Sequence, residues 1–231
     1  MKTPIVIITG YLGVGKTTLL RHIIDSTRGR KIAILMNEFG DIGIDGEVIK
    51  GSAIDVVELL GGCVCCSLTG EFEAAIKEIK EKINPELIIV ETTGVAEPDA
   101  IVGDITENIP DVRLDCVGTI VDADSVLRFP VIGHTGKMQI EIADIILLNK
   151  IDLAEDNIED VRNKIIEING KALIVKAVQC KVPVDLILDT KAEHKVKGKE
   201  ERSHVSKEGI GHFVYTSGKT MLLEKIMHIF D

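Results

Sequence analysis

The chain has 231 residues, of which 45% are hydrophobic and 28% are charged, so it is long enough to close a sizeable core around one domain. Its formal net charge of −10 argues against broad binding to a nucleic-acid backbone, although a local phosphate pocket is not excluded. No apolar run reaches the roughly 18–20 residues of a membrane span. No small-residue cleavage site follows the opening apolar run, so we expect a cytoplasmic protein.

Strand-like apolar runs alternate with amphipathic stretches along most of the chain, a pattern typical of βα units around a parallel sheet. In chain order, we expect a strand at residues 5–9, a helix at 16–27, strands at 31–36 and 54–60, a helix at 69–83, strands at 87–90, 116–121 and 145–148, a helix at 158–168 and a strand at 173–175. The predicted fold class is α/β, with a doubly wound, mostly parallel sheet. Only 3% of the residues are aromatic, which suits an aliphatic core of this kind.

The composition changes near residue 190. Residues 191–208 are charged and have no apolar face, so we expect a solvated linker there. A last strand at residues 212–216 and a helix at 221–230 are expected to follow. The predicted organisation is therefore one domain over residues 1–190, with residues 191–231 as a linker and a short strand–helix appendage.

Residues 10–17, with the sequence GYLGVGKT, match the pattern G-x-x-x-x-G-K-[ST] between an expected strand and an expected helix. Glycines let a backbone wrap around an anion and point successive N–H groups inward at the positive end of a helix. We expect Lys16 to reach the β- and γ-phosphates of a nucleotide and the Thr17 hydroxyl to bind Mg²⁺. This motif predicts a P-loop NTPase, with phosphate-binding residues Gly10, Gly13, Val14, Gly15, Lys16, Thr17 and Thr18.

A later expected strand ends in a carboxylate, Glu91, and Gly94 follows three residues further on. The carboxyl ends of strands in a doubly wound sheet meet at one rim, where ligands bind. Glu91 is therefore predicted to hold Mg²⁺ directly or through water, and the Gly94 N–H to contact the γ-phosphate.

The expected strand at residues 145–148 is followed by Asn149, Lys150 and Asp152 in the pattern N-K-x-D. A carboxylate at Asp152 can accept hydrogen bonds from both N1–H and the 2-amino group of guanine, which adenine does not offer. Losing that match leaves a desolvated charge, so a site of this kind discriminates strongly. The order of the motifs favours GTP over ATP.

Three of the five cysteines, Cys63, Cys65 and Cys66, lie close together in a glycine-led segment. Thiolates suit Zn²⁺, Cu⁺ or Co²⁺. C-x-C-C does not easily close a four-sulfur site, and an incomplete site fits metal delivery better than a permanent structural role. A redox-active pair and buried, unreactive thiols are the alternatives. Cys116 and Cys180 are interpreted first as packing residues.

Together with further segments, these motifs resemble those of the CobW-like family of P-loop GTPases, relatives of the hydrogenase and urease nickel-insertion GTPases. The shared segments are residues 10–18, NEFG at 37–40, GGCVCC at 61–66, ETTGVAEP at 91–98, QIEIAD at 139–144 and NKID at 149–152. The resemblance implies GTP hydrolysis coupled to the handling of Zn²⁺, Co²⁺ or a similar ion at the cysteine motif. It also suggests that Glu38 and Asp41 help to bind the metal or Mg²⁺. Only the expected strand–helix appendage stands where the family usually carries a C-terminal domain.

The leading hypothesis is a metallochaperone-type GTPase with slow turnover in the absence of client or metal. GTP and Mg²⁺ would order the segments that flank the thiols and complete a metal site, which hydrolysis would loosen. The expected partners are a client metalloprotein and, in a nucleotide-dependent homodimer, a second copy of the chain. One alternative is a nucleotide-gated metal-sensing or client-assembly module with little turnover, and another is a GTPase controlled by a thiol redox switch.

Overall fold

The computed structural model describes residues 2–27, 29–36, 54–58, 69–94, 98–154, 157–188 and 190. These residues all belong to one compact unit, Met1–Val196. The expected linker, strand and helix of the tail lie outside the described residues, so the division of the chain after residue 190 stays a prediction.

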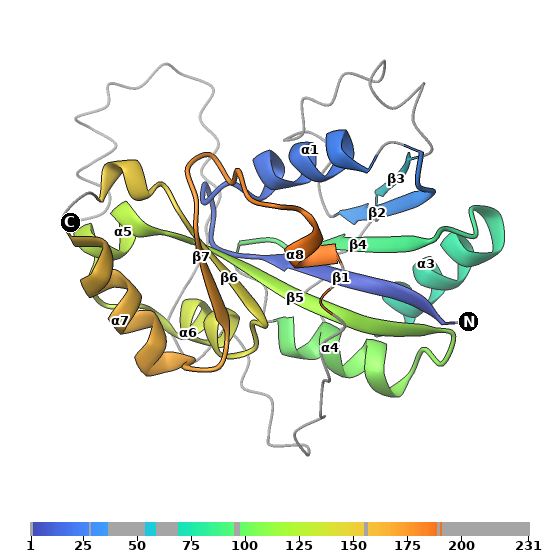
Figure 1. Cartoon of the computed structure of the whole chain (residues 1–231). Coiled ribbons are helices and arrows are strands. Elements are labelled where there is room, and N and C mark those ends of the chain that lie inside the picture. Colours follow the sequence, from blue (N-terminus) through green and yellow to red (C-terminus); the bar gives the residue numbers. More distant parts are fainter. Residues whose placement is uncertain are drawn as a thin grey trace, which may run out of the picture. The chain divides into compact units, whose positions relative to one another are not determined.

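A seven-stranded parallel sheet forms the centre of the described chain (Figure 1). The elements in chain order are β1 (Thr3–Thr9), α1 (Lys16–Ser26), β2 (Ile32–Met36), β3 (Ile54–Glu58), α3 (Thr69–Lys82), β4 (Leu87–Glu91), α4 (Pro98–Glu107), β5 (Val112–Asp122), α5 (Ala123–Arg128), α6 (His134–Glu141), β6 (Ile145–Asn149), the 3₁₀ turn η2 (Ile151–Leu153), α7 (Ile158–Ile168), β7 (Leu173–Lys176) and α8 (Asp185–Leu188).

The strands lie in the order β3-β2-β4-β1-β5-β6-β7. The chain moves from β1 toward one edge of the sheet, returns at β4, and then continues through β5 toward the other edge. Because crossovers between parallel strands are right-handed, this reversal places helices on both faces of the sheet. The predicted doubly wound α/β fold is confirmed.

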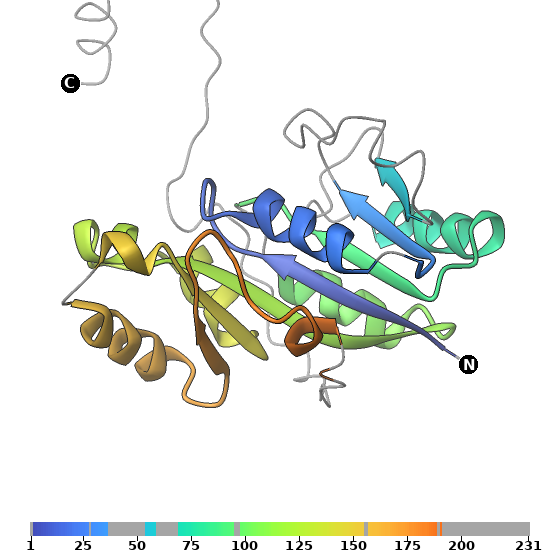
Figure 2. The ribbon, with the colours of Figure 1, turned by 45° about the horizontal axis from the view of Figure 1, so that its top comes forward.

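Alternating side chains of the strands build a core on each face of the sheet. Val6 of β1 belongs to the apolar cluster that includes Leu19 of α1, and α8 lies on this same face in both ribbon views (Figures 1 and 2). Its neighbour Ile7 belongs to the cluster on the opposite face, with Ile76 of α3 and Ile101 of α4. The sheet centre is therefore aliphatic and dry, which gives the loops at its rim a rigid base.

Four described helices were not expected from the sequence: α4, α5, α6 and α8. The first begins at Pro98, a residue that suits the first helical turn. The second has only six residues and the third only eight. Helices this short show too few turns for a 3.6-residue apolar period to stand out. None of the described helices is long and apolar enough to cross a membrane.

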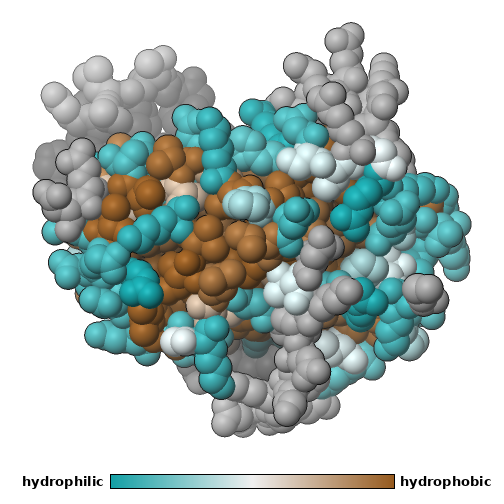
Figure 3. All heavy atoms as spheres, viewed as in Figure 1, coloured by the Kyte–Doolittle hydropathy of each residue, from teal (hydrophilic) through white to brown (hydrophobic). Residues whose placement is uncertain are grey.

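The edge strand β7 is less covered than the centre of the sheet. Around β7 and α8, the side chains of Leu173, Val178 and Leu186 are exposed. Figure 3 shows a continuous apolar area on the face of the molecule that carries these two elements. The described helices therefore cover the sheet centre more fully than this edge.

Candidate nucleotide-binding site

The predicted nucleotide motifs follow the carboxyl ends of strands, which lie along one rim of the sheet. The strand register pairs Ile8 of β1 with Glu91 of β4, and Asp122 of β5 with Asn149 of β6. Because β1 lies between β4 and β5, the carboxyl ends of these four strands lie side by side. This is the rim at which ligands bind in open α/β sheets.

Residues 10–15 form the turn between β1 and α1, which we call the phosphate loop. At two of its glycines the neighbouring atoms leave no room for a side chain. Gly10 has a φ of 138° and Gly15 a φ of 116°, both in the region that favours glycine. A Cβ at Gly10 would lie 2.5 Å from the carbonyl oxygen of Ile120, and one at Gly15 would lie 2.7 Å from Sγ of Cys180. The turn therefore packs against β5 on one side and against the segment after β7 on another.

Lys16 begins α1 and is only 8% exposed. Its Nζ donates to the carbonyl oxygens of Gly10 at 2.9 Å and Tyr11 at 3.2 Å, so the ammonium group lies against the turn itself. Thr17 follows in the first helical turn and is half-buried. With the positive end of α1 added, these groups provide the charge and donors that a chain of phosphates needs.

The segment after β4 contacts the same turn. Glu91 is half-buried at the strand end, and the N–H of Thr92 donates to the carbonyl of Ile8 at 3.0 Å. A Cβ at Gly94 would lie 2.6 Å from the backbone nitrogen of Leu12. Gly94 therefore packs directly on the phosphate loop, which leaves it no room for a side chain.

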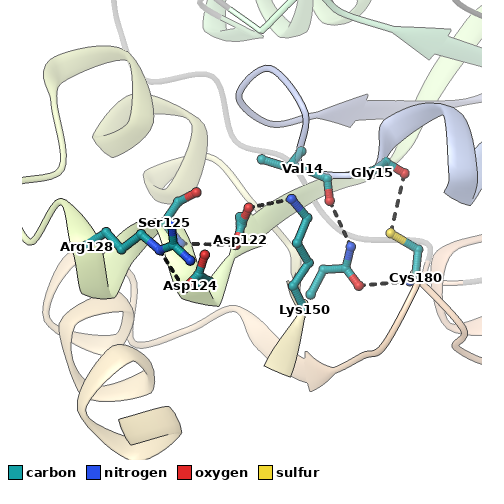
Figure 4. Close-up of polar contacts among 9 residues, drawn as sticks. Val14, Gly15, Asp122, Asp124, Ser125, Arg128, Lys150 and Cys180 are labelled. Atoms are coloured by element: carbon teal, nitrogen blue, oxygen red, sulfur yellow. Dashed lines mark hydrogen bonds and ion pairs between the residues drawn. The ribbon is translucent and has the colours of Figure 1, made fainter. Parts of the chain in front are cut away.

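Asn149 links three segments at the other end of the site, and Figure 4 labels its bonding partners Val14 and Cys180. Its side chain is 2% exposed, donates from Nδ2 to the carbonyl of Val14 at 2.8 Å, and accepts at Oδ1 from the N–H of Cys180 at 2.8 Å. The thiol of Cys180 in turn donates to the carbonyl of Gly15 at 3.4 Å. These bonds tie the N-K-x-D loop and the segment after β7 to the phosphate loop.

Cys180 is buried, as its interpretation as a packing residue predicts, and Cys116 in β5 is buried as well. Burial raises the pKa of the Cys180 thiol to about 11, so the thiol is protonated at neutral pH and able to donate. Cys180 and Gln179 have φ values of 54° and 53°, a conformation uncommon for residues other than glycine. The contact between Cys180 and the phosphate loop was not predicted.

Lys150 is held by an acidic residue that lies outside the sequence motifs. Its Nζ donates to Oδ2 of Asp122 at 2.6 Å, and Oδ1 of the same carboxylate accepts from the N–H of Ser125 at 3.1 Å. Burial alone would raise the pKa of Asp122, but the hydrogen bonds from Lys150 and Ser125 hold the pKa below its ordinary value. Asp152 lies exposed in the 3₁₀ turn that follows.

Asp122 carried the same signal that identified Glu91, since both are acids that directly follow an expected strand. The strand of Asp122 runs three residues past the end of β1, because Thr119 pairs with Thr9. That extra length brings its carboxylate beside the N-K-x-D loop, and strand length is not readable from the local pattern.

The predicted transition-metal ligands are Cys63, Cys65, Cys66, Glu38 and Asp41, and all lie outside the described residues. The chain leaves the described sheet toward them at Met36 and Glu58, which are register partners at the carboxyl ends of β2 and β3. Within the described part of the chain, no group of three His, Cys, Asp or Glu residues could hold a metal ion.

A glycine turn between the first strand and first helix, with a lysine against it, defines a P-loop nucleotide-binding protein. Residues 4–176 match the family described as CobW/HypB/UreG, nucleotide-binding domain. The chain belongs to this family, which confirms the resemblance drawn from its motifs.

The chain is also similar to two curated relatives and one solved structure. The zinc chaperone CobW of Pseudomonas aeruginosa is 34% identical, over 83% of the chain and 61% of that protein. The zinc-regulated GTPase metalloprotein activator 1 of Schizosaccharomyces pombe is 34% identical, over 75% of the chain and 45% of that protein. The chain thus spans about half the length of these curated relatives.

The solved structure is that of the Zn(II)-bound YjiA GTPase from Escherichia coli. It superimposes with a TM-score of 0.66 and 24% identity, over 90% of this chain and 69% of that one. This likeness supports the fold.

Proposed function

We propose that the chain binds GTP with Mg²⁺ at this rim and hydrolyses GTP slowly to GDP and phosphate. The observation that carries the proposal is the bridge made by Asn149, which bonds to Val14 on one side and to Cys180 on the other. Because of it, the loop that would read the base and the loop that would hold the phosphates keep a constant spacing. One nucleotide spanning both loops needs that spacing.

The residues present suit a guanine nucleotide. Gly10 and Gly15 let the turn pack closely against its neighbours, the turn would offer backbone N–H groups to the phosphates, and Lys16 would neutralise the β- and γ-phosphates. Asp152 would accept from the guanine edge. The donor set also suits magnesium, since Thr17 supplies a hydroxyl and Glu91 a carboxylate, and Mg²⁺ when bound would neutralise charge on the phosphate oxygens.

The second part of the proposal is that a thiophilic ion is the cargo, bound through Cys63, Cys65 and Cys66 with Glu38 and Asp41. Thiolates are soft donors that favour zinc, with cobalt as a further candidate. The names of the two curated relatives favour zinc. The segments that carry these residues follow the carboxyl ends of β2 and β3, at the same rim of the sheet where the nucleotide loops begin. This proximity would let the nucleotide state change the affinity for the ion.

The proposed partners are a client metalloprotein and a second copy of the chain. Tyr11 and Leu12 are 55% and 77% exposed on the phosphate loop itself. Apolar side chains beside a nucleotide suit a contact that forms only when the nucleotide is bound.

Free thiols also suit the reducing conditions of the cytoplasm.

Phosphate release from GTP and from ATP tests the nucleotide part. We expect release from GTP alone, with Asp152→Asn losing the preference for guanine by about 100-fold, because a polar group left unpaired against the bound base is costly. Asp160→Asn, on the exposed side of α7, is the matched control and should keep that preference. Equal turnover of GTP and ATP by the unaltered protein would contradict the proposal.

Zinc titration in the presence of a non-hydrolysable GTP analogue or of GDP tests the metal part. Affinity should be higher with the analogue, and Cys65→Ala should weaken zinc binding while GTP binding stays within twofold of the unaltered protein. Equal zinc affinities in the two states would remove the coupling. Coupled binding with negligible turnover would instead support a metal-sensing module.

A further inference from the structure

The segment QIEIAD at residues 139–144 belongs to the sequence pattern of the chain, yet nothing in the proposed function uses it. Gln139 lies in the last turn of α6 and is 2% exposed. Its Nε2 donates to the carbonyl oxygen of Gly94 at 3.2 Å, across 45 residues of sequence. A buried side chain of α6 therefore contacts the residue that packs on the phosphate loop.

Gly94 is held on two sides. A Cβ placed on it would lie 2.6 Å from the backbone nitrogen of Leu12 and 3.1 Å from the carbonyl carbon of Tyr11. Its carbonyl is held by Gln139. Glycine has two nearly unrestricted backbone torsions, so contacts of this kind decide which way its peptide groups point.

The main chain of Gln139 is itself bound to the sheet. Carbonyl groups in the last turn of a helix have no partner within that helix. The hydroxyl of Thr119 in β5 donates to the carbonyl of Gln139 at 2.6 Å. Thr119 is the register partner of Thr9, the last residue of β1. The amide of Gln139 therefore extends toward Gly94 from a position determined by the central strands.

The end of α6 is stabilised by a different residue. Asn169 donates from Nδ2 to the carbonyls of Ile140 at 2.8 Å and Ala143 at 3.0 Å. The helix end thus has carbonyl partners that do not involve the Gln139 side chain. An apolar side chain could fill the same buried space. A buried amide that instead bonds to another segment therefore makes a specific link between the two segments.

We propose that Gln139 is a positioning residue for GTP hydrolysis: its bond to the Gly94 carbonyl, together with the packing of Gly94 on Tyr11 and Leu12, restricts both backbone torsions of Gly94 so that the Gly94 N–H faces the γ-phosphate. The proposal rests on the proposed GTP hydrolysis and assigns a role to a residue outside the nucleotide motifs. An N–H that is already oriented needs no rearrangement when charge develops on the γ-phosphoryl oxygens. GDP lacks this phosphate, so its binding should not depend on Gln139.

The test compares Gln139→Met with the unaltered chain. Methionine has a similar length and no donor, and we expect kcat for GTP to fall roughly five- to tenfold, the effect of one hydrogen bond. Affinity for a non-hydrolysable GTP analogue should fall by a similar factor, while affinity for GDP stays within twofold. Asn169→Ala is the matched control, expected to lower the unfolding temperature and leave kcat within twofold.

An unchanged kcat in Gln139→Met, or a parallel loss of GDP affinity, would overturn the proposal. Gly94→Ala distinguishes failure of this proposal from failure of the proposed function, because this variant should lose GTP hydrolysis. If the unaltered protein itself does not hydrolyse GTP, it is the proposed function that fails.

A measurement on the unaltered protein removes the dependence on variants that fold. The chain has only two glutamines, Gln139 and Gln179, so ¹⁵N-glutamine labelling resolves both side-chain amides. Gln179 is exposed and serves as the internal reference. The Gln139 amide protons should exchange with solvent far more slowly and shift between the GDP and GTP-analogue states. Exchange as fast as that of Gln179 would refute the bond on which the role depends.

Discussion

Lys150 is restrained at both ends, and this restraint is the residue-scale feature that most directly affects the N-K-x-D loop. Its backbone has a φ of 58°, and its ammonium is bound to Asp122 at 2.6 Å. Figure 4 shows the side chain of Lys150 reaching the carboxylate of Asp122. The side chain of Asp122 is 8% exposed and that of Lys150 34% exposed, so the pair is shielded more than a surface ion pair.

Asp122→Asn should therefore weaken nucleotide binding without unfolding α5. Asparagine can still accept from the Ser125 N–H, whereas the charge that holds Lys150 is gone. We expect the dissociation constant for GDP, measured by calorimetry, to rise about three- to tenfold, in line with an ion pair worth about 1 kcal/mol. Asp124→Asn removes the neighbouring, more exposed pair with Arg128 and should change the constant less than twofold.

The same carboxylate makes a pH-dependent contribution to stability. Its pKa in the folded protein lies below the ordinary value of 3.8, so near and below pH 4 the unfolded chain binds more protons than the folded one. The stabilisation is complete above this range and is lost as the pH falls through the folded pKa. Urea unfolding should show the unaltered protein more stable than Asp122→Asn at pH 7, with the difference in free energy of unfolding shrinking as the pH falls below the ordinary carboxyl pKa of 3.8. A constant difference would contradict this assignment.

At the scale of elements, the end of α6 depends on one side chain from the following helix. Asn169 donates to carbonyls of α6 and accepts at Oδ1 from the N–H groups of Lys171 at 3.0 Å and Ala172 at 3.1 Å. It thereby joins α6, the end of α7 and the start of β7. Asn169 is buried, so removing it leaves several backbone groups without partners.

Asn169→Ala is expected to lower the free energy of unfolding by about 2–3 kcal/mol, measured by urea denaturation. Asn157 at the other end of α7 offers the control, because its exposed side chain makes no capping hydrogen bond. Asn157→Ala should change the free energy by about 0.5 kcal/mol or less. Equal losses in the two variants would show that the bonds of Asn169 do not stabilise the fold.

At the scale of the whole molecule, the nucleotide site joins the two halves of the sheet. The phosphate loop follows β1 and contacts Gly94 after β4, while Asn149 at the end of β6 and Cys180 after β7 contact it from the other half. A ligand that bridges these segments stabilises the folded chain as a unit.

GDP at about 100 times its dissociation constant should therefore raise the free energy of unfolding by about 2.7 kcal/mol. ADP at the same concentration should give less than a quarter of that rise, because the base loop is expected to reject adenine. Thermal unfolding followed by circular dichroism checks both nucleotides. Equal shifts for GDP and ADP would show that the N-K-x-D loop does not select the base.

The sequence by itself determined the strands, the longer helices, the phosphate loop and the order of the motifs, because each rests on neighbouring residues whose spacing is local. It also indicated the cysteine motif, whose metal role stays a prediction outside the described residues. The tertiary structure alone decided that Lys150 meets Asp122, that Gln139 meets Gly94 and that Cys180 meets Gly15, across 28, 45 and 165 residues of sequence. These contacts depend on strand order, strand length and register, which set distances between remote segments and leave no period in the sequence.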